Sequence, residues 1–457
     1  MISLKALSSK AYYVVGLARS GQATVRALKK SGAKVFVFDD SVESSVPDYI
    51  RPEDVDWSAL DGLILSPGIP HTFPSPHKTA ERAKAHNVPI LCDIDLLAQA
   101  CPKAFFVGIT GTNGKSTTTA LLHHLLPESH MGGNIGLPVL DIEADSEKQD
   151  DLFLLELSSY QLERVPHLKC SVAVCLNVTP DHLDRHGDFQ GYVEAKKKLF
   201  LPFGDPQTVI IGIDEEASFE IYTSLKKDDA KKVIPLSGCK ILQEGISVLD
   251  GILYDRGREV ASLLEVKRLL GAHNRQNISA AYAVMKALGK SFALEEVILF
   301  KGLPHRQEYV EHKSNVTFIN DSKATNITST LKALSCYSSV HLLLGGISKE
   351  SGLSDLEQEK KSIAHAYVFG DAAKQFSQEL TEKGIPHSCF KTLEEATKKA
   401  AQAAFQEADR GAKEITVLLS PACSSFDQFK DFEERGEAFK LIVHVIVNQQ
   451  EGAVSHG

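Results

Sequence analysis

Short apolar runs alternate with longer amphipathic stretches along most of the chain. The runs include AYYVVGLA near the start, AFFVGITG and DLFLLELSS in the middle, and HLLLGG and ITVLLSPA towards the end. Further runs of this kind are KVFVFDD, GLILSPG, SVAVCLNVT and VTFINDS. Runs this short and this rich in Val, Ile, Leu and Phe indicate strands buried on both faces of parallel sheets. Helical patterns such as GQATVRALKKSG follow them, so the sequence predicts an α/β protein with mostly parallel sheets.

The length and composition fit a globular protein with several domains. The chain has 457 residues, of which 43% are hydrophobic and 24% charged. A domain takes roughly 150 residues, which predicts about three domains. We place the boundaries near residues 101–103 and 302–304. The expected domains are residues 1–101, 102–303 and 304–457.

Charge and cysteine usage exclude several classes of protein. The net charge of −9 argues against a dedicated nucleic-acid surface, which usually needs a basic excess. The eight cysteines form no C-x-x-C pair, so a zinc ribbon or redox motif is not expected. No segment approaches the roughly 18 apolar residues of a membrane span. We expect a cytoplasmic monomer with reduced thiols, no membrane insertion and no nucleic-acid partner.

The strongest single motif is GITGTNGKSTTT at residues 108–119. A Gly-rich turn between a strand and a helix presents backbone N–H groups to an anion, and the helix N-terminus adds to the attraction. Ile109 departs from the strict Walker pattern, which leaves the shorter G-x-x-G-K-S. A plain helix N-cap is the alternative interpretation. The motif predicts ATP binding by Gly111, Thr112, Asn113, Gly114, Lys115, Ser116 and Thr117, with Lys115 on the phosphates and Ser116 on Mg²⁺.

Polar side chains follow the next two predicted strands. Glu156 ends DLFLLE, and His182 comes after SVAVCLNV. Carboxyl ends of parallel strands meet at one edge, so both can converge on the phosphate loop. From the residues alone, Glu156 is either a metal ligand or an ion-paired structural acid, and His182 can be a loop hydrogen-bonder. Asn134, in the Gly-rich GGNIGLP, can be a turn former because asparagine tolerates positive φ.

The N-terminal VVGLARSG gives Gly16-x-Ala18-x-x-Gly21 after a strand, with Asp39 at the end of the next strand. This is an imperfect dinucleotide fingerprint, because alanine replaces the middle glycine that lets the backbone approach a pyrophosphate. On its own it is weak evidence for NAD. Asp39 can instead be a strand-terminal cap.

Taken together, these motifs resemble the Mur ligase family, whose nucleotide loop is also similar to that of the related folylpolyglutamate synthases. The resemblance covers essentially the whole chain. It implies a Rossmann-like substrate domain, a central P-loop ATPase domain and a Rossmann-like C-terminal domain. It rests on GITGTNGKST, NIGLP, LELSSYQLE, NVTPDHLDRH, YVEAK, GAHNRQN, GLPHR, NDSKATN, LLLGG and SPACSSFDQFKDFEERG.

The resemblance implies an ATP-dependent amide ligase that works through an acyl phosphate and uses two Mg²⁺ ions. One ion would be held by Ser116 and the ATP phosphates, and the other by Glu156, His182 and a CO₂-derived carbamate on Lys196. Without the family, Lys196 reads as a solvated lysine in a basic run. A cationic lysine about 4 Å from a positive charge would be repelled by roughly 4 kcal/mol per charge pair, and a carbamate reverses the sign.

The resemblance assigns roles to further residues. Catalytic roles fall to Lys115, Asn134, His182 and Lys196. Contacts with the uridine diphosphate of the substrate fall to Arg19, Ser20, Asp39, Asp40 and Gly68. Further ATP contacts fall to Asn274, Asn277, Arg306, Asp321 and Lys323, with His305 beside them. Generic alternatives are a helix cap for Asp321 and a surface ion pair for Arg306.

The C-terminal SPACSSFDQFKDFEERG is similar to the D-glutamate-adding members of the family, and the DNPR-type signature of the diaminopimelate-adding members is absent. We therefore expect the chain to add D-glutamate to UDP-N-acetylmuramoyl-L-alanine in the synthesis of peptidoglycan precursors. The residues that match positions gripping D-glutamate are Thr325, Lys349, Ser425 and Phe432. Ile347 departs from the usual pattern, which has an acid there.

Three other functions compete with this one. A folylpolyglutamate synthase should lack the uridine-type N-terminal domain and SPACSSFDQF. An NAD-dependent oxidoreductase would leave the phosphate loop, Glu156 and His182 unexplained. A catalytically inactive binding module is disfavoured by the intact Lys115, Glu156, His182 and Lys196.

Overall fold

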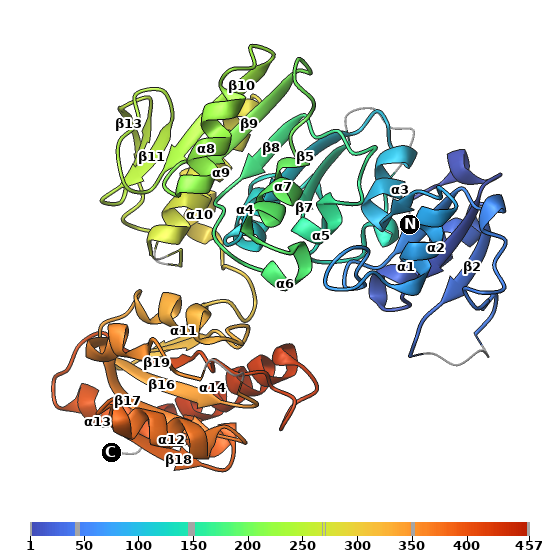
Figure 1. Ribbon diagram of the computed structural model, residues 1–457. Coiled ribbons are helices and arrows are strands. Elements are labelled where there is room, and N and C mark those ends of the chain that lie inside the picture. The colour runs from blue at the N-terminus through green and yellow to red at the C-terminus, as the bar shows by residue number, and fades with distance from the viewer. Residues whose placement is uncertain are drawn as a thin grey trace. The chain divides into compact units, whose positions relative to one another are not determined.

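The computed structural model describes residues 2–41, 46–144, 151–266, 268–269, 271–348 and 352–454. The chain forms two compact units, one of Met1–Val266 with Ala272–Ile298 and one of Lys267–Gly271 with Leu299–Gly457. The first unit holds two sheets and the second unit holds one (Figure 1). The boundaries expected near 101–103 and 302–304 stay predictions.

The first sheet is parallel throughout, in the order β2-β1-β3-β4. Side chains alternate between its faces, so Tyr12 and Val14 pack towards α1 and α3 while Tyr13 and Val15 pack towards α2. The elements are β1 (Ala11–Val15), α1 (Arg19–Lys30), β2 (Lys34–Phe38), β3 (Gly62–Leu65), α2 (Lys78–Ala85), β4 (Ile90–Leu91) and α3 (Asp93–Ala100). Short 3₁₀ helices lie at Lys5–Leu7 and Trp57–Ala59.

The second sheet has nine strands in the order β13-β12-β11-β10-β9-β8-β5-β7-β6. Its strands are parallel except for the antiparallel pairs β11–β12 and β12–β13. The strands are β5 (Phe105–Thr110), β6 (His130–Gly133), β7 (Leu152–Glu156), β8 (Val172–Cys175), β9 (Gln207–Gly212), β10 (Lys231–Ser237), β11 (Ile246–Leu249), β12 (Ile252–Asp255) and β13 (Arg258–Ser262). The helices are α4 (Lys115–Leu125), η3 (Val139–Asp141), α5 (Ser159–Leu162), α6 (Leu183–His186), α7 (Phe189–Lys197), α8 (Glu216–Leu225), α9 (Ala272–Ala287) and α10 (Leu294–Leu299).

One hydrophobic cluster runs from the first sheet into the second. It joins Tyr12 and Val14 of β1 with Ile94 of α3, and continues to Phe106 of β5 and Phe153 of β7. Because these side chains share one core, the two sheets form a single compact unit by their contacts.

The third sheet has the order β14-β15-β19-β16-β17-β18, with β14 alone antiparallel. Leu342 and Leu344 of β16 face α11 and α12, and Leu343 faces α13 and α14. The elements are β14 (Glu308–Lys313), β15 (Val316–Asn320), α11 (Ile327–Leu334), β16 (Val340–Gly345), η4 (Leu356–Ser362), β17 (Ile363–Phe369), α12 (Ala373–Glu382), β18 (His387–Phe390), α13 (Leu393–Asp409), β19 (Ile415–Leu419) and α14 (Phe432–Val454).

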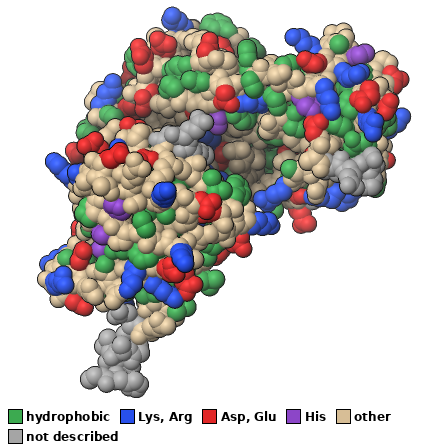
Figure 2. Space-filling view, turned by 60° about the horizontal axis from the view of Figure 1, so that its bottom comes forward, with side chains coloured by type: hydrophobic (Ala, Val, Ile, Leu, Met, Phe, Trp, Pro, Cys, Tyr) green, Lys and Arg blue, Asp and Glu red, His purple; other side chains and the backbone are tan. Residues whose placement is uncertain are grey.

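The predicted fold class is confirmed, because the sheets are mostly parallel and helices pack on them. Each of the nine apolar runs named from the sequence contains a strand. Among the described residues, no helix is both long and apolar enough to cross a membrane. Acidic and basic side chains are interspersed over the face drawn in Figure 2, a mixture that weakens the field of either sign.

Candidate functional site

The phosphate loop joins β5 to α4, and its backbone conformation resembles that of an anion-binding loop. Gly111 and Gly114 have φ values of 152° and 86°, which favour glycine. Gly114 is the N-cap of α4. Among the described residues, no side chain forms a capping hydrogen bond with this end of the helix. Lys115 Nζ donates to the carbonyls of Gly111 (2.8 Å) and Thr112 (3.0 Å). The helix N-terminus and the lysine therefore surround the loop as a phosphate cradle requires.

Three asparagines support this loop and the helix that follows it. Asn177 Oδ1 accepts from the backbone N–H of Asn113 (2.9 Å). Asn277 Oδ1 accepts from the Thr118 hydroxyl (3.2 Å), and its Nδ2 donates to Asn274 Oδ1 (2.9 Å). A Cβ on Gly114 would lie 2.3 Å from Asn277 Oδ1, so glycine lets the loop approach this side chain. Asn274 and Asn277 thus support the loop, and their direct contact with ATP stays a prediction.

Glu156 ends β7 beside the phosphate loop, in register with Ile109 of β5. Its side chain is 1% exposed. Oε1 accepts from Asn134 Nδ2 (2.9 Å), and the backbone N–H of Asn134 donates to the Glu156 carbonyl (2.9 Å). Oε2 is buried and has no hydrogen-bond partner among the described residues. Burying a carboxylate oxygen without a hydrogen bond costs free energy. The position therefore suits a cation that binds together with a ligand.

Lys196 projects from α7 to the end of β5 and is 1% exposed. Its Nζ donates to the Gly111 carbonyl (2.9 Å) and to Thr110 Oγ1 (3.5 Å), and it lies 4.6 Å from the centre of the Tyr192 ring. Burial, and after it the charge of Lys115, lower the pKa of Lys196 to about 7. A large fraction of this side chain is therefore a neutral amine at neutral pH.

His182 lies at the exposed edge of this group. It is the N-cap of α6, with a left-handed φ of 52°, and its side chain is 49% exposed. Its ring centre is 5.1 Å from that of Tyr160, and Nε2 is 3.6 Å from Asp181 Oδ2. Within the described ranges, no three His, Cys, Asp or Glu side chains are grouped to hold a metal ion. A metal at Glu156 therefore needs a further ligand of another kind.

The N-terminal loop forms a second opening at the start of a helix. Gly16 has φ of 91°, and a Cβ there would lie 2.5 Å from Ser66 Oγ. α1 begins at Arg19 after the N-cap Ala18, which offers no side-chain cap. Ser20 lies in the same first turn, and a Cβ on Gly68 would meet no atom within 4 Å. Gly16 thus lets its loop pack closely against Ser66, and the predicted contacts of Arg19, Ser20 and Gly68 with the uridine diphosphate stay predictions.

Both aspartates after β2 are engaged within the protein. Asp39 Oδ2 accepts from the backbone N–H of Leu17 (2.7 Å), and Oδ1 accepts from Ser41. Burial alone would raise the pKa of Asp39, but these hydrogen bonds hold it below its usual value. Asp40 pairs with His77 Nε2 (2.8 Å) and Lys78 Nζ (3.0 Å). Asp39 thus closes the glycine loop, and the substrate contacts of both residues stay predictions.

The second unit gathers its predicted residues where β15 ends. Asp321 is buried, accepts from the backbone N–H of Gln307 (3.1 Å) and from Ser420 Oγ (2.8 Å), and burial raises its pKa to about 7. Lys323 Nζ lies 3.8 Å from the centre of the Phe432 ring, and its backbone N–H donates to the His305 carbonyl (3.0 Å). Arg306, next in sequence to His305, is exposed.

The residues expected to grip D-glutamate are described in part. Thr325 is half-buried, and Ser425 is buried, with its carbonyl accepting from the backbone N–H groups of Gln428 and Phe429. Lys349 lies outside the described residues. Ile347, which replaces an acid, pairs through its backbone with Ser424 at 3.0 and 3.2 Å. The main chain therefore shapes this loop without the acid.

Sequence reasoning missed three arginines. Arg435 is buried, and its guanidinium donates to Ser322, Cys423 and Gly345, which ties α14 to the ends of β15, β19 and β16. Arg164 and Arg185 hold a loop of the first sheet. All three lie within or directly after motifs of the resemblance, but arginine is mostly found at protein surfaces, so nothing in the sequence indicated their burial.

The middle of the chain, residues 109–285, matches the model of the Mur ligase middle domain. A protein of Rhodospirillum rubrum named UDP-N-acetylmuramoylalanine–D-glutamate ligase is 44% identical, over 97% of this chain and 96% of the relative. A protein of Caulobacter vibrioides with the same name is 42% identical, over 97% of this chain and 98% of the relative.

Solved structures share the fold. The MurF ligase of Thermotoga maritima in complex with ADP matches with a TM-score of 0.56 and 15% identity, over 97% of each chain. The UDP-N-acetylmuramate–alanine ligase MurC of Thermotoga maritima matches with a TM-score of 0.57 and 18% identity, over 96% of this chain and 100% of that one. At this level of identity, the likeness shows the arrangement of strands and helices alone.

Proposed function

The chain belongs to the Mur ligase family, and from this premise we propose that it joins D-glutamate to UDP-N-acetylmuramoyl-L-alanine, with cleavage of ATP to ADP and phosphate. Relatives named for this reaction are 42–44% identical over 97% of the chain. The product is a precursor of peptidoglycan. We also propose that the chain works as a cytoplasmic monomer.

The observation that carries this proposal is the convergence of Lys115, Glu156 and Lys196 on the end of β5. The alanine carboxylate would attack the γ-phosphorus of ATP, ADP would leave, and an acyl phosphate would form. The amine of D-glutamate would then attack the acyl carbon and expel phosphate. Lys115, whose Nζ donates to the carbonyls of Gly111 and Thr112, would turn to the β- and γ-phosphates.

The buried groups fit the two Mg²⁺ ions that the family implies. Glu156 Oε2 is a buried oxygen without a partner among the described residues, and Ser116 lies in the first turn of α4 beside the loop. A carbamate on Lys196 would add the further ligand, with His182 at the exposed edge. Mg²⁺ keeps several waters, so few protein ligands suffice. When bound, the ions would neutralise charge on the transferring phosphoryl group.

A phosphate-release assay tests the proposal. With ATP and UDP-N-acetylmuramoyl-L-alanine present, D-glutamate should start turnover, and L-lysine or meso-diaminopimelate should not. Lys115→Ala should lower turnover by about 1,000-fold or more, because an ammonium at the transferring phosphoryl stabilises the transition state. Equal phosphate release with L-lysine would contradict the proposed amino-acid substrate.

A further inference from the structure

Two arginines from the central part of the first unit grip one loop of its first sheet. The loop spans residues 65–73, between β3 and α2, and contains Gly68. It is also joined to the N-terminal glycine loop, because Ser66 Oγ donates to the Gly16 carbonyl (3.0 Å). A residue that fixes the 65–73 loop therefore also helps to fix the glycine loop at the start of α1.

Arg164 makes the larger set of contacts. Nη1 donates to the carbonyls of Leu65 and Ser66 (both 3.0 Å), and Nη2 donates to the carbonyl of Ile69 (2.6 Å). Nε and Nη2 both donate to His71 Nδ1 (3.3 and 3.1 Å). The side chain is 0% exposed. Its five donors are thus spent on backbone and ring acceptors of one loop, and none of these acceptors carries a charge.

His71 is suited to accept from this guanidinium. Burial, and next the charge of Arg164, lower the pKa of His71 to about 3. The ring is therefore neutral at physiological pH, with Nδ1 as the acceptor and the proton on Nε2. A protonated ring would have no lone pair on Nδ1 to accept the hydrogen bond. Because the pKa is far below physiological pH, the ring stays neutral and keeps this contact.

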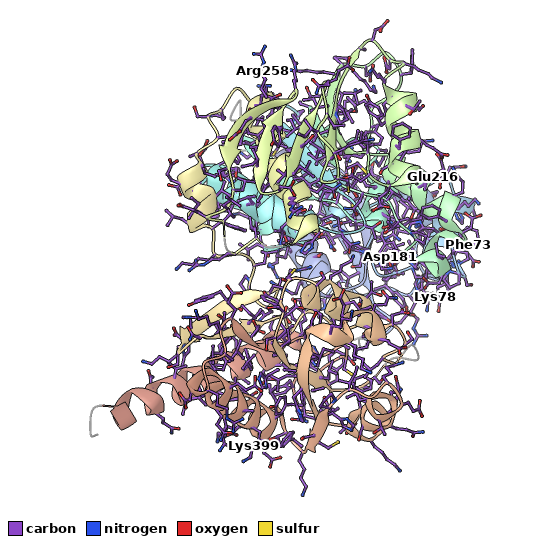
Figure 3. All side chains as sticks on the ribbon, turned by 90° about the vertical axis from the view of Figure 1, so that its left-hand side faces the viewer. Phe73, Lys78, Asp181, Glu216, Arg258 and Lys399 are labelled. Carbon is purple, nitrogen blue, oxygen red and sulfur yellow. The ribbon has the colours of Figure 1, made fainter. Side chains whose placement is uncertain are left out.

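Arg185 holds the far end of the same loop. Nη1 donates to the Phe73 carbonyl (2.8 Å), Nη2 lies 3.4 Å from the Pro67 carbonyl, and the guanidinium lies 4.7 Å from the centre of the Tyr160 ring. A Cβ on Gly187 would lie 3.2 Å from the Phe73 ring, so glycine makes room for it. Figure 3 labels Phe73 and Asp181 in this part of the first unit.

Both arginines come from segments that also carry the phosphate-transfer residues. Arg164 follows α5, which begins three residues after Glu156 at the end of β7. Arg185 lies in α6, whose N-cap is His182. The 65–73 loop therefore accepts hydrogen bonds from side chains of the two segments that also carry Glu156 and His182.

We propose that Arg164 is a positioning residue for the UDP-linked substrate, fixing the 65–73 loop so that the bound substrate presents its carboxylate to the phosphate-transfer residues. This inference rests on the proposed function, which places the uridine diphosphate against Gly68. Packing alone does not explain the residue. A buried guanidinium must be desolvated, and apolar side chains of similar volume often fill such places without loss of stability. The guanidinium of Arg164 instead orients the carbonyl groups of Leu65, Ser66 and Ile69.

The matched control is Arg26. Its Nη2 pairs with Asp141 Oδ2 at 2.7 Å, so it also links α1 of the first sheet to η3 of the central part. Among the described residues, no hydrogen bond or ion pair joins Arg26 to the 65–73 loop. Arg26→Met therefore removes an arginine that also joins these two parts but leaves the 65–73 loop untouched, and it should leave substrate binding unchanged.

The experiment compares Arg164→Met, Arg164→Lys, Arg185→Gln and Arg26→Met with the wild type. Calorimetry without ATP gives the Kd for UDP-N-acetylmuramoyl-L-alanine, and phosphate release gives the KM for each substrate. Arg164→Met should raise that Kd and the matching KM about 10- to 100-fold, by the scale of lost charged hydrogen bonds. The KM for ATP should change less than about two-fold. Arg164→Lys should restore part of the affinity, and Arg185→Gln should raise the Kd by less.

A wild-type Kd in folded Arg164→Met overturns the inference. Arg185→Gln keeps the test decisive if Arg164→Met does not fold, since Arg185 is only half-buried, and a wild-type Kd there also overturns it. An equal rise in the KM for ATP and for the UDP-linked substrate would show a general structural role instead. Failure of the wild type to bind the UDP-linked substrate would contradict the proposed function, not the role of Arg164 within it.

Discussion

The proposed carbamate on Lys196 makes activity depend on carbon dioxide. Carbon dioxide reacts with a neutral amine and releases a proton. A lysine at its usual pKa of 10.5 is neutral in only about 1 molecule in 3,000 at pH 7. With its pKa lowered to about 7, Lys196 is neutral in about half of the molecules. The lowered pKa therefore raises the reactive fraction by about 1,500-fold.

Lys196→Ala removes this group. We expect turnover to fall about 100-fold or more, because the loss of one metal ligand or its support typically costs 10- to 100-fold and the charge balance changes as well. Short-chain carboxylates such as acetate should restore part of the activity by standing in for the carbamate. The matched control is Lys197→Ala, since Lys197 is the next residue of α7 but is exposed and paired with Glu194 at 2.8 Å.

A readout independent of turnover comes from ¹³C-labelled carbon dioxide. The wild type should show a carbamate signal that Lys196→Ala lacks and Lys197→Ala keeps. The signal should weaken as pH falls below about 7, because protonation of Lys196 removes the reactive amine. Full activity of unsupplemented Lys196→Ala, or an equal signal in that variant, would refute the reasoning.

Three further substitutions test other parts of the site. Glu156→Gln should lower turnover about 100-fold, because a neutral amide is a poor metal ligand. It should leave the melting temperature unchanged or higher, because an amide costs less to bury than a carboxylate with an oxygen that lacks a partner; a large loss of stability would contradict this. Asp321 has its pKa raised from 3.8 to about 7, so the folded protein holds a proton that the unfolded chain releases, and stability should fall by roughly 4 kcal/mol as pH rises through this window. In Asp321→Asn, the free energy of unfolding measured with urea should no longer fall between pH 5 and pH 8. If it still falls, another group causes the pH dependence. Lys349→Ala should raise the KM for D-glutamate about 10- to 100-fold and leave the KM for ATP nearly unchanged; the reverse pattern would place Lys349 at the nucleotide.

The strands and the phosphate loop were predictable because their signals are local. An apolar run such as AFFVGITG is a strand in any parallel sheet, and the glycines after it allow the positive φ found at Gly111 and Gly114. Which apolar residues meet across the unit is not local. Nothing in the sequence pairs Tyr12 with Phe153, so the shared core of the first two sheets emerges only in the structure.

The same distinction applies to the site. Glu156 could be placed beside the phosphate loop because parallel strands end at one edge of the sheet. The burial of Lys196 could not, because its run of three lysines has the appearance of a solvated surface. Asn277 was predicted to contact ATP, but its hydrogen bond to Thr118 is visible only when α9 is placed against α4.

The buried charges of this protein fall into two kinds, which differ in how fully they are hydrogen-bonded. The guanidinium groups of Arg164 and Arg435 each donate to several backbone carbonyls, so their desolvation is offset within the folded chain. Glu156 has one of its two oxygens satisfied, and Lys196 has one short hydrogen bond to a carbonyl and one long contact to a hydroxyl. A fully bonded ion is best suited to hold structure, because any ligand would have to displace its partners. An ion left half-bonded in the interior is costly without a ligand and gains when one arrives. On this ground we propose that Arg164 and Arg435 position their neighbours, and that Glu156 and Lys196 take part in the chemistry at the end of β5.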